Sequence, residues 1–253
     1  MATEALVYGI HAVCAALAQG RVRALWLDVS RQDSRLNALR RAATTIPRQE
    51  TERTTLDAMV HGIQHQGVVA RCVGLQPLAE GDLPTLLGMM QEPPFLLVLD
   101  GVQDPHNLGA CLRSADAAGV HAVLAPRDRA AGLTPAVRKV ASGAAEVVPF
   151  VQVTNLARTL RDLKDLGVWL VGASGNGPQS LYDAKLTGPL ALVMGTEGRG
   201  LRRLTAELCD FLVHIPMLGT VESLNVSVAT GICLFEALRQ RQVNHQSPSP
   251  PLG

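Results

Sequence analysis

Three segments of this 253-residue chain carry polar residues at spacings that could support chemistry. The first runs from Leu99, the last residue of the apolar run Phe95–Leu99, to Arg113, and it contains Asp104 and Asn107. An acidic residue before a proline is typical of a helix start. Small residues make the expected helix thin, so another backbone could approach it closely. Asn107 and Arg113 are therefore either a cap and a solvated charge or parts of a packed polar interface.

The second segment is a glycine-rich turn after the apolar run Leu190–Met194, with glycines at 195, 198 and 200. Backbone amides in such a turn can cradle a ligand. The GxxGxG spacing matches neither a P-loop nor the dinucleotide fingerprint. Glu197 within the turn would repel pyrophosphate but could bind a hydroxyl or lie near a cation. A tight turn with an exposed glutamate explains the segment equally well.

The third segment follows an apolar run that ends at Pro216 and turns through Gly219. We expect a helix to begin after it, with Ser223 as the N-cap. Ser223, Asn225 and Ser227 are short polar residues, which are poor helix formers and serve better at caps and sites. The apolar residues among and after them lie on one helical face and are expected to be core.

The elements that position these segments follow from apolar runs alternating with helical patterns. The expected strands of the second half are 95–99, 122–125, 147–151, 168–171, 190–194 and 211–215, and the helices are 107–118, 134–141, 155–166, 201–208 and 224–240. This alternation predicts an α/β fold with a parallel sheet covered on both faces. We expect an N-terminal α/β domain at 1–74, a Pro/Gly-rich linker at 75–94, the larger domain at 95–243 and a disordered tail at 244–253.

Composition limits the classes of function. The net charge is +1, hydrophobic residues make up 47% and aromatic residues only 3%. These values argue against binding nucleic acid through bulk charge or aromatic stacking, yet residues 21–53 carry eight arginines against four acidic residues. Neither a membrane span nor a signal peptide is expected. Five dispersed cysteines without a CxxC pair favour a reducing cytoplasm.

The three segments, taken in order, resemble the three motifs of the SPOUT superfamily, and within it the RNA ribose 2′-O-methyltransferases. The resemblance covers about residues 95–240. Val7–Val13, His65–Val68 and Val137–Glu146 resemble the subgroup that methylates a guanosine ribose in the peptidyl-transferase region of 23S ribosomal RNA.

The resemblance implies a C-terminal domain with a trefoil knot that binds S-adenosyl-L-methionine, an N-terminal RNA substrate-binding domain, and a homodimer. Its substrate would be 23S rRNA or a large-subunit assembly intermediate. The implied catalytic residues are Asn107, Arg113, Glu197, Ser223 and Asn225. The implied cofactor-binding residues are Gly195, Ile215, Pro216, Met217 and Leu224.

An arginine at the position of Arg113 has been proposed in this family to activate the ribose hydroxyl. Because a guanidinium is effectively never deprotonated in proteins, we hypothesise that Arg113 instead binds a flanking phosphate and stabilises the developing alkoxide. Arg40, Arg41 and His65 are candidates for RNA binding. The spacing of His61 and His65 resembles a zinc pair but lacks the HExxH glutamate, so no metal is expected.

Three alternatives stay open at this point. A transfer-RNA guanosine 2′-O-methyltransferase of the same family would share the three motifs, although the N-terminal motif favours ribosomal RNA. A noncatalytic RNA-binding relative would keep the fold but would not need Asn107, Arg113 and Glu197. A nucleotide-dependent oxidoreductase is disfavoured by the glycine spacing.

Overall fold

The computed structural model describes residues 4–246, and it divides the chain into two compact units. Unit 1 comprises the described residues up to Gln76 together with Ser142–Val147. Unit 2 comprises Pro77–Ala141 and the described residues from Val148 onward. Residues 247–253 of the expected disordered tail lie outside the described residues, whereas residues 244–246 continue the last helix.

Unit 1 is built on a four-stranded sheet with the order β1-β4-β2-β3. Its elements are β1 (Glu4–Tyr8), α1 (Ile10–Ala18), β2 (Val22–Asp28), α2 (Ser34–Ala42), β3 (Arg48–Thr51), α3 (Arg53–Met59), β4 (Val68–Val73) and the 3₁₀ turn η2 (Ala144–Glu146). β4 pairs antiparallel with β1 and β2, and β3 pairs parallel with β2. The Asp33 carboxylate accepts a hydrogen bond from the Leu36 N–H at 3.1 Å, which caps α2.

The segment Ser142–Val147 lies in unit 1, although we expected it within the domain 95–243. The Arg21 guanidinium donates to the Glu146 backbone carbonyl at 2.6 Å and pairs with its carboxylate at 3.3 Å. A Cβ atom at Gly143 would lie 2.7 Å from the Ala12 Cβ, so this glycine permits close packing on α1. Such long-range packing has no signature in the local sequence pattern.

Unit 2 contains an eight-stranded sheet with the order β10-β12-β9-β11-β6-β7-β8-β5, and its strand pairs are parallel. Its strands are β5 (Leu78–Ala79), β6 (Phe95–Leu99), β7 (Ala122–Pro126), β8 (Phe150–Val153), β9 (Trp169–Ala173), β10 (Gln179–Ser180), β11 (Leu190–Met194) and β12 (Phe211–His214). Its helices are α4 (Leu83–Gly88), α5 (Pro105–Ala117), α6 (Pro135–Ala141), α7 (Leu156–Asp165), α8 (Arg203–Leu208) and α9 (Val226–Gln246), with 3₁₀ turns η1 (Glu80–Asp82) and η3 (Leu181–Asp183).

The expected linker 75–94 is largely ordered structure of unit 2. β5 pairs with β8 in the register Leu78↔Val151, and Leu83 at the start of α4 is buried in the core. Prolines and glycines mark breaks between elements, but they do not reveal a strand that pairs with a segment far along the chain. The second unit therefore begins at Pro77.

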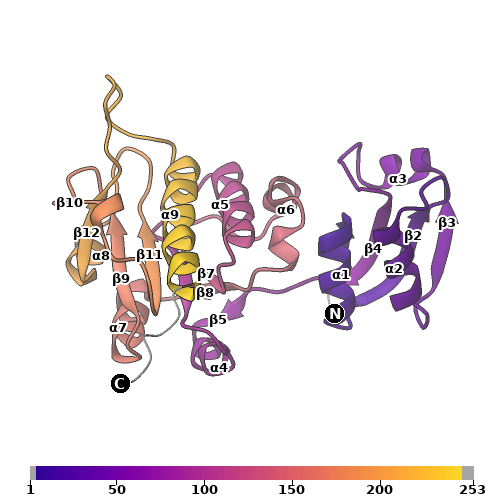
Figure 1. The fold of residues 1–253 in the computed structure, drawn as a ribbon, viewed down its shortest axis with the longest axis horizontal. Helices are drawn as coiled ribbons and strands as arrows, with labels where there is room; N and C mark the ends of the chain where they lie inside the picture. Colours follow the sequence, from indigo (N-terminus) through magenta and orange to yellow (C-terminus); the bar gives the residue numbers. More distant parts are fainter. Residues whose placement is uncertain (1–3, 247–253) are drawn as a thin grey trace. The chain divides into compact units, whose positions relative to one another are not determined.

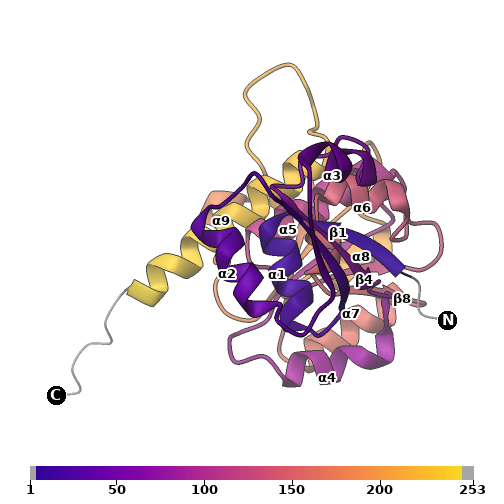
Figure 2. The ribbon, with the colours of Figure 1, turned by 90° about the vertical axis from the view of Figure 1, so that its right-hand side faces the viewer.

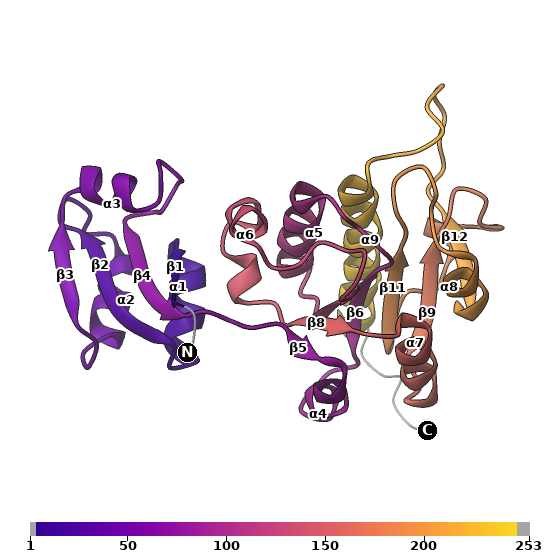
Figure 3. The same ribbon diagram turned by 180° about the vertical axis from the view of Figure 1, so that it is seen from behind.

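Helices cover both faces of the large sheet, as the parallel pattern predicts. α5, α6 and α9 lie on one face, and α4, α7 and α8 lie on the other (Figures 1 and 3). Leu96 and Val98 of β6 pack in the same core cluster as Leu160 of α7. The segment between β12 and α9 projects from the unit as an open loop (Figure 2). No helix within residues 4–246 is long and apolar enough to cross a membrane.

Candidate active site

The three polar segments follow the carboxyl ends of β6, β11 and β12, three strands of one parallel sheet. β11 lies between β9 and β6, and Met194 is in register with Leu99. The Asp100 N–H donates to the Met194 carbonyl at 2.7 Å, so the loops after β6 and β11 start side by side. Carboxyl ends of strands where the strand order reverses are the usual ligand site of open α/β sheets.

The glycine-rich turn after β11 closes tightly on itself. The Thr196 N–H donates to the Gly200 carbonyl at 3.0 Å, and the Gly200 N–H donates to the Thr196 carbonyl at 2.9 Å. A Cβ atom at Gly195 would lie 2.0 Å from the carbonyl carbon of Gly200. Gly198 and Gly200 have positive φ angles of 75° and 64°. Only glycine therefore fits at these positions without strain.

A buried carboxylate that the sequence analysis did not single out anchors the end of this turn. Asp100 is 0% exposed and accepts a hydrogen bond from the Arg202 N–H at 2.9 Å. The Arg202 Nε lies 3.5 Å from the Asp100 Oδ1, which has no hydrogen-bond partner within the described structure. An aspartate directly after a continuous apolar strand is the sequence signal for such an anchor. Its partner Arg202 could be identified only from the fold.

Side chains from all three segments meet in one hydrogen-bond network. The Asn107 Nδ2 donates to the Glu197 Oε1 at 3.3 Å, and the Asn225 Nδ2 donates to the Asn107 Oδ1 at 2.9 Å. The Asn225 Nδ2 also donates to the Glu197 Oε1, and the Val226 N–H donates to the same oxygen at 3.3 Å. Residues more than one hundred positions apart are thus joined around one carboxylate. The sequence analysis had placed these three side chains in one site.

The helix start of the third segment differs from the expectation. α9 begins at Val226, and the Asn225 Oδ1 accepts hydrogen bonds from the Ser227 N–H at 2.9 Å and from the Ser227 Oγ at 2.6 Å. Asn225 is therefore the N-cap, and the expected cap Ser223 lies two residues outside the helix, exposed to solvent. Serine and asparagine both cap helices well. The contact between Asn225 and Glu197 therefore decides which of Ser223 and Asn225 is the cap.

Arg113 lies apart from this network. It is exposed on α5 and forms no hydrogen bond or ion pair with residues 4–246. It lies six residues beyond Asn107, which is about 9 Å along the helix axis and on a different side of the helix. Its guanidinium is accordingly free to meet a ligand or a second macromolecule.

The loop between β12 and α9 offers unpaired backbone groups. None of the backbone amides of residues 215–224 has a hydrogen-bond partner among the described residues. Ile215 and Leu224 are half-buried, whereas Pro216 and Met217 are exposed. Free amides beside apolar side chains fit a ligand that has both a polar purine and an aliphatic portion. This set, together with the closed turn at Gly195, suits S-adenosyl-L-methionine.

The three RNA-binding candidates of unit 1 differ in their surroundings. The Arg40 guanidinium contacts both Glu50 carboxylate oxygens at 3.0 Å and the backbone carbonyls of Asp28 and Arg31 at 3.1 Å each. His65 is 3% exposed, and both ring nitrogens have partners. Both side chains are engaged in contacts within the protein, and their role in RNA binding stays a prediction. Arg41 is exposed.

The chain resembles known proteins in both of its parts. The family model "SpoU rRNA Methylase family" matches residues 94–235, and the model "RNA 2'-O ribose methyltransferase substrate binding" matches residues 6–78. A Pseudomonas putida protein named 23S rRNA (guanosine-2'-O-)-methyltransferase RlmB is 56% identical, covering 94% of this chain and 97% of that protein. A Yersinia pestis protein of the same name is 58% identical, covering 93% and 97%.

Two solved structures show the same architecture. The SpoU methyltransferase AviRb from Streptomyces viridochromogenes, in complex with AdoMet, is 28% identical with a TM-score of 0.71, covering 95% of this chain and 91% of that chain. A TrmH/SpoU tRNA modifying enzyme from A. aeolicus is 30% identical with a TM-score of 0.56, covering 66% and 84%. On its sequence, its fold and the matched motifs, this chain belongs to the SpoU rRNA methylase family.

Proposed function

We propose that this protein transfers a methyl group from S-adenosyl-L-methionine to the 2′-hydroxyl of a guanosine in 23S ribosomal RNA. The observation that carries the chemistry is the network of Asn107, Glu197 and Asn225, which gathers the three loops around one carboxylate. The choice of substrate is supported by relatives of that name that are similar over nearly the whole chain.

The cofactor would be held by the turn at Gly195, by Ile215–Met217 and by Leu224. When bound, it supplies an electrophilic methyl group on a sulfonium. Transfer needs alignment of the ribose oxygen with that methyl group, so positioning supplies much of the acceleration. The protein's part is therefore to hold loops and substrate in a fixed geometry.

Glu197 orients the ribose in this proposal. Its Oε1 accepts hydrogen bonds from Asn107, Asn225 and the Val226 N–H, and its Oε2 has no partner among the described residues. The free oxygen can accept a hydrogen bond from a substrate hydroxyl. Asn107 and Asn225 keep the carboxylate in place.

Arg113 acts as an electrostatic clamp. A planar guanidinium binds a phosphate through two hydrogen bonds and stabilises negative charge that develops on the attacking oxygen. Ser223 lies in the same loop as the cofactor candidates and would contact the substrate or the cofactor once both are bound.

The remaining parts of the proposal concern assembly. We place the RNA-binding domain in unit 1 and the methyl-transfer domain in unit 2, with a trefoil knot in the latter and a homodimer as the active form. A large-subunit assembly intermediate is a second form of the substrate. The five free cysteines suit a reducing compartment, so we propose the cytoplasm.

The test is methyl transfer from labelled S-adenosyl-L-methionine to unmethylated ribosomal RNA, with the modified nucleotide mapped. We expect label on the ribose of one guanosine in 23S rRNA, and labelling about 10²-fold slower after Glu197→Gln substitution. Naked RNA and pre-ribosomal particles are compared in parallel. Label on transfer RNA but not on ribosomal RNA would overturn the choice of substrate and favour the tRNA enzyme.

A further inference from the structure

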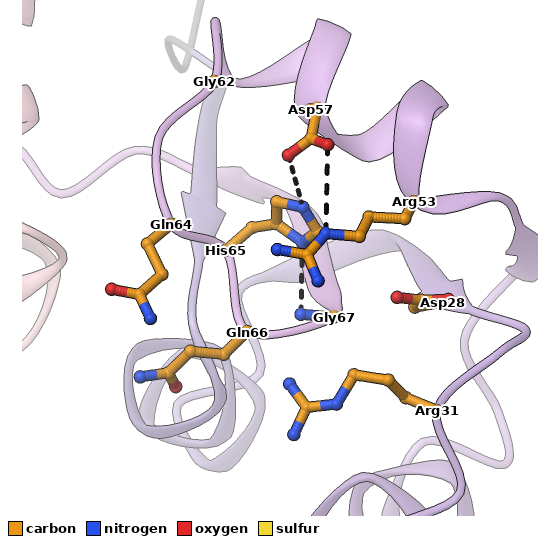
Figure 4. Close-up of a pocket in the computed structure, with 9 residues that line it drawn as sticks. All are labelled: Asp28, Arg31, Arg53, Asp57, Gly62, Gln64, His65, Gln66 and Gly67. Carbon is orange, nitrogen blue, oxygen red and sulfur yellow. Dashed lines mark hydrogen bonds and ion pairs between the residues drawn. The ribbon is translucent and has the colours of Figure 1, made fainter.

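Unit 1 contains a cavity that the methyl-transfer chemistry does not use. Its volume is about 350 Å³, within the range of small-ligand pockets. Asp28 at the end of β2, Arg31 in the turn that follows, and Arg53 and Asp57 of α3 line it, and the loop before β4 supplies the remaining wall (Figure 4). All of these residues lie within the region matched by the substrate-binding family model.

His65 fixes one wall of the cavity through hydrogen bonds at both ring nitrogens. Its Nδ1 accepts a hydrogen bond from the Gly67 N–H at 3.1 Å, so the ring proton is on Nε2. The Nε2 lies 3.0 Å from the Asp57 Oδ1 and donates to it. His65 thereby joins the loop to α3, which explains why this histidine is buried.

The wall that carries Arg31 is also built rigidly. A Cβ atom at Gly67, whose φ is +80°, would lie 2.9 Å from the Arg31 Cδ, so the arginine stem packs directly on the glycine. The Arg40 guanidinium donates hydrogen bonds to the backbone carbonyls of Asp28 and Arg31, which are two of the residues that line the cavity. The cavity is therefore preorganised, and Arg40 is a positioning residue for it.

Both signs of charge line the cavity. The guanidiniums of Arg31 and Arg53 lie beside the carboxylates of Asp28 and Asp57, and the Arg31 guanidinium also pairs with the Asp33 carboxylate at 2.6 Å. Burial raises the pKa of Asp28, but hydrogen bonds from Ser30 and the nearby His65 and Arg53 outweigh it, so the net pKa is lowered. A phosphate in this cavity would lie beside that carboxylate. The cavity instead places guanidinium donors next to carboxylate acceptors, and this arrangement suits the edges of a nucleobase, which also carry both donors and acceptors.

We propose that this cavity binds one unstacked guanine of the RNA substrate, an inference that rests on the proposed function. Guanine has N1–H and 2-amino donors on one edge. The Asp28 Oδ1 already accepts hydrogen bonds from the Ser30 N–H and Oγ, so the Asp28 Oδ2 would accept from this edge. The O6 and N7 acceptors on another edge of guanine are the preferred partners of a guanidinium such as Arg31. Arg53 offers a planar group for stacking in a domain poor in aromatic residues.

The test measures binding of the full chain to a short fluorescent oligouridylate with one central guanine. Two further oligonucleotides carry a replacement for the central guanine. Inosine lacks the 2-amino group, and 7-deazaguanine lacks N7. We expect each change to weaken wild-type binding about tenfold. Asp28→Asn should lose the sensitivity to inosine but keep that to 7-deazaguanine, and Arg31→Gln should do the reverse. Arg23→Gln, which makes the same charge change on an exposed part of β2, should keep both sensitivities.

Several results would overturn the assignment. One is equal wild-type affinity for guanine, adenine and cytosine strands. Another is that Arg31→Gln weakens all strands equally and lowers the salt slope by about one, which is the behaviour of a phosphate contact. Circular dichroism checks that each variant is folded. If Asp28→Asn does not fold, Arg31→Gln with 7-deazaguanine decides the proposal.

The site can be separated from methyl transfer. Glu197→Gln lies in unit 2 and should retain guanine discrimination while losing most methyl transfer. Intact discrimination without any labelling of 23S rRNA in the wild type would refute only the proposed function. Labelling of 23S rRNA without discrimination would refute only the guanine site.

Discussion

Replacement of Gly195 by alanine tests whether the closed turn after β11 holds the cofactor. The new Cβ would lie 2.0 Å from the Gly200 carbonyl carbon, whereas carbon atoms in contact are about 3.5–4.0 Å apart. The obstacle is backbone, so the two sides of the turn must separate by about 1.5 Å. That movement breaks both hydrogen bonds between Thr196 and Gly200, which together contribute about 2 kcal/mol to the turn.

Displacement of an active-site segment by about 1 Å can lower a rate by about 10²-fold. We therefore expect Gly195→Ala to weaken S-adenosyl-L-methionine binding, measured by calorimetry, and to lower single-turnover methyl transfer by about 10²-fold or more. The circular dichroism spectrum should stay that of a folded protein, because the strands and helices do not depend on this turn.

Gly88→Ala is the matched control. A Cβ at Gly88 meets no heavy atom within 4 Å, and its φ is not positive. This variant adds the same methyl group to α4, away from the three loops of the site, and should bind the cofactor as the wild type does. Wild-type affinity and rate in Gly195→Ala would refute the reasoning, since the turn would then be remote from the cofactor.

Four further outcomes are expected. Glu197→Gln should lower kcat by about 10²-fold while leaving cofactor affinity unchanged, and a parallel loss of affinity in calorimetry would contradict its role toward the ribose. Arg113→Lys should lose most methyl transfer with no shift in the activity–pH midpoint; substantial activity with a midpoint that follows lysine would rule out the bidentate clamp. Arg40→Ala should destabilise the protein to urea by about 2 kcal/mol because it removes the Glu50 and carbonyl contacts, whereas exposed Arg41→Ala should change stability by less than about 0.5 kcal/mol. Hydrogen bonds from Thr154 and the charge of Arg158 lower the pKa of Glu80 to about 2, so its stabilisation is present above pH 4.5 and is lost as the pH falls toward 2; Glu80→Gln should lack this loss in acid unfolding titrations.

Periodic and local features were predictable from the sequence. Continuous apolar runs such as Leu190–Met194 identified buried parallel strands, because a strand covered on both faces needs apolar residues at every position. The family resemblance implied that Asn107, Glu197 and Asn225 belong to one site, and the three motifs that carry them follow strands of one parallel sheet.

The local sequence pattern did not predict the helix cap or the arginines that are already paired, because both depend on residues far along the chain. Ser223 and Asn225 cap helices almost equally well, and contact with Glu197 selected Asn225. The arginine excess at 21–53 predicted RNA contacts, but Arg40 is bound to Glu50 and to backbone carbonyls. Composition counts charges and cannot show which of them are already paired.

The sequence by itself determined the fold class and the order of the elements, since these depend on residue type and spacing, and the family resemblance predicted the residues of the three-loop site. Only the tertiary structure decided that Ser142–Val147 belongs to unit 1, that Arg202 pairs with Asp100, and that a cavity lined by charges of both signs forms beside His65. Each of these depends on side chains that meet across long sequence separations. These long-range contacts are determined by packing and by the pairing of buried polar groups, which the local sequence pattern does not reveal.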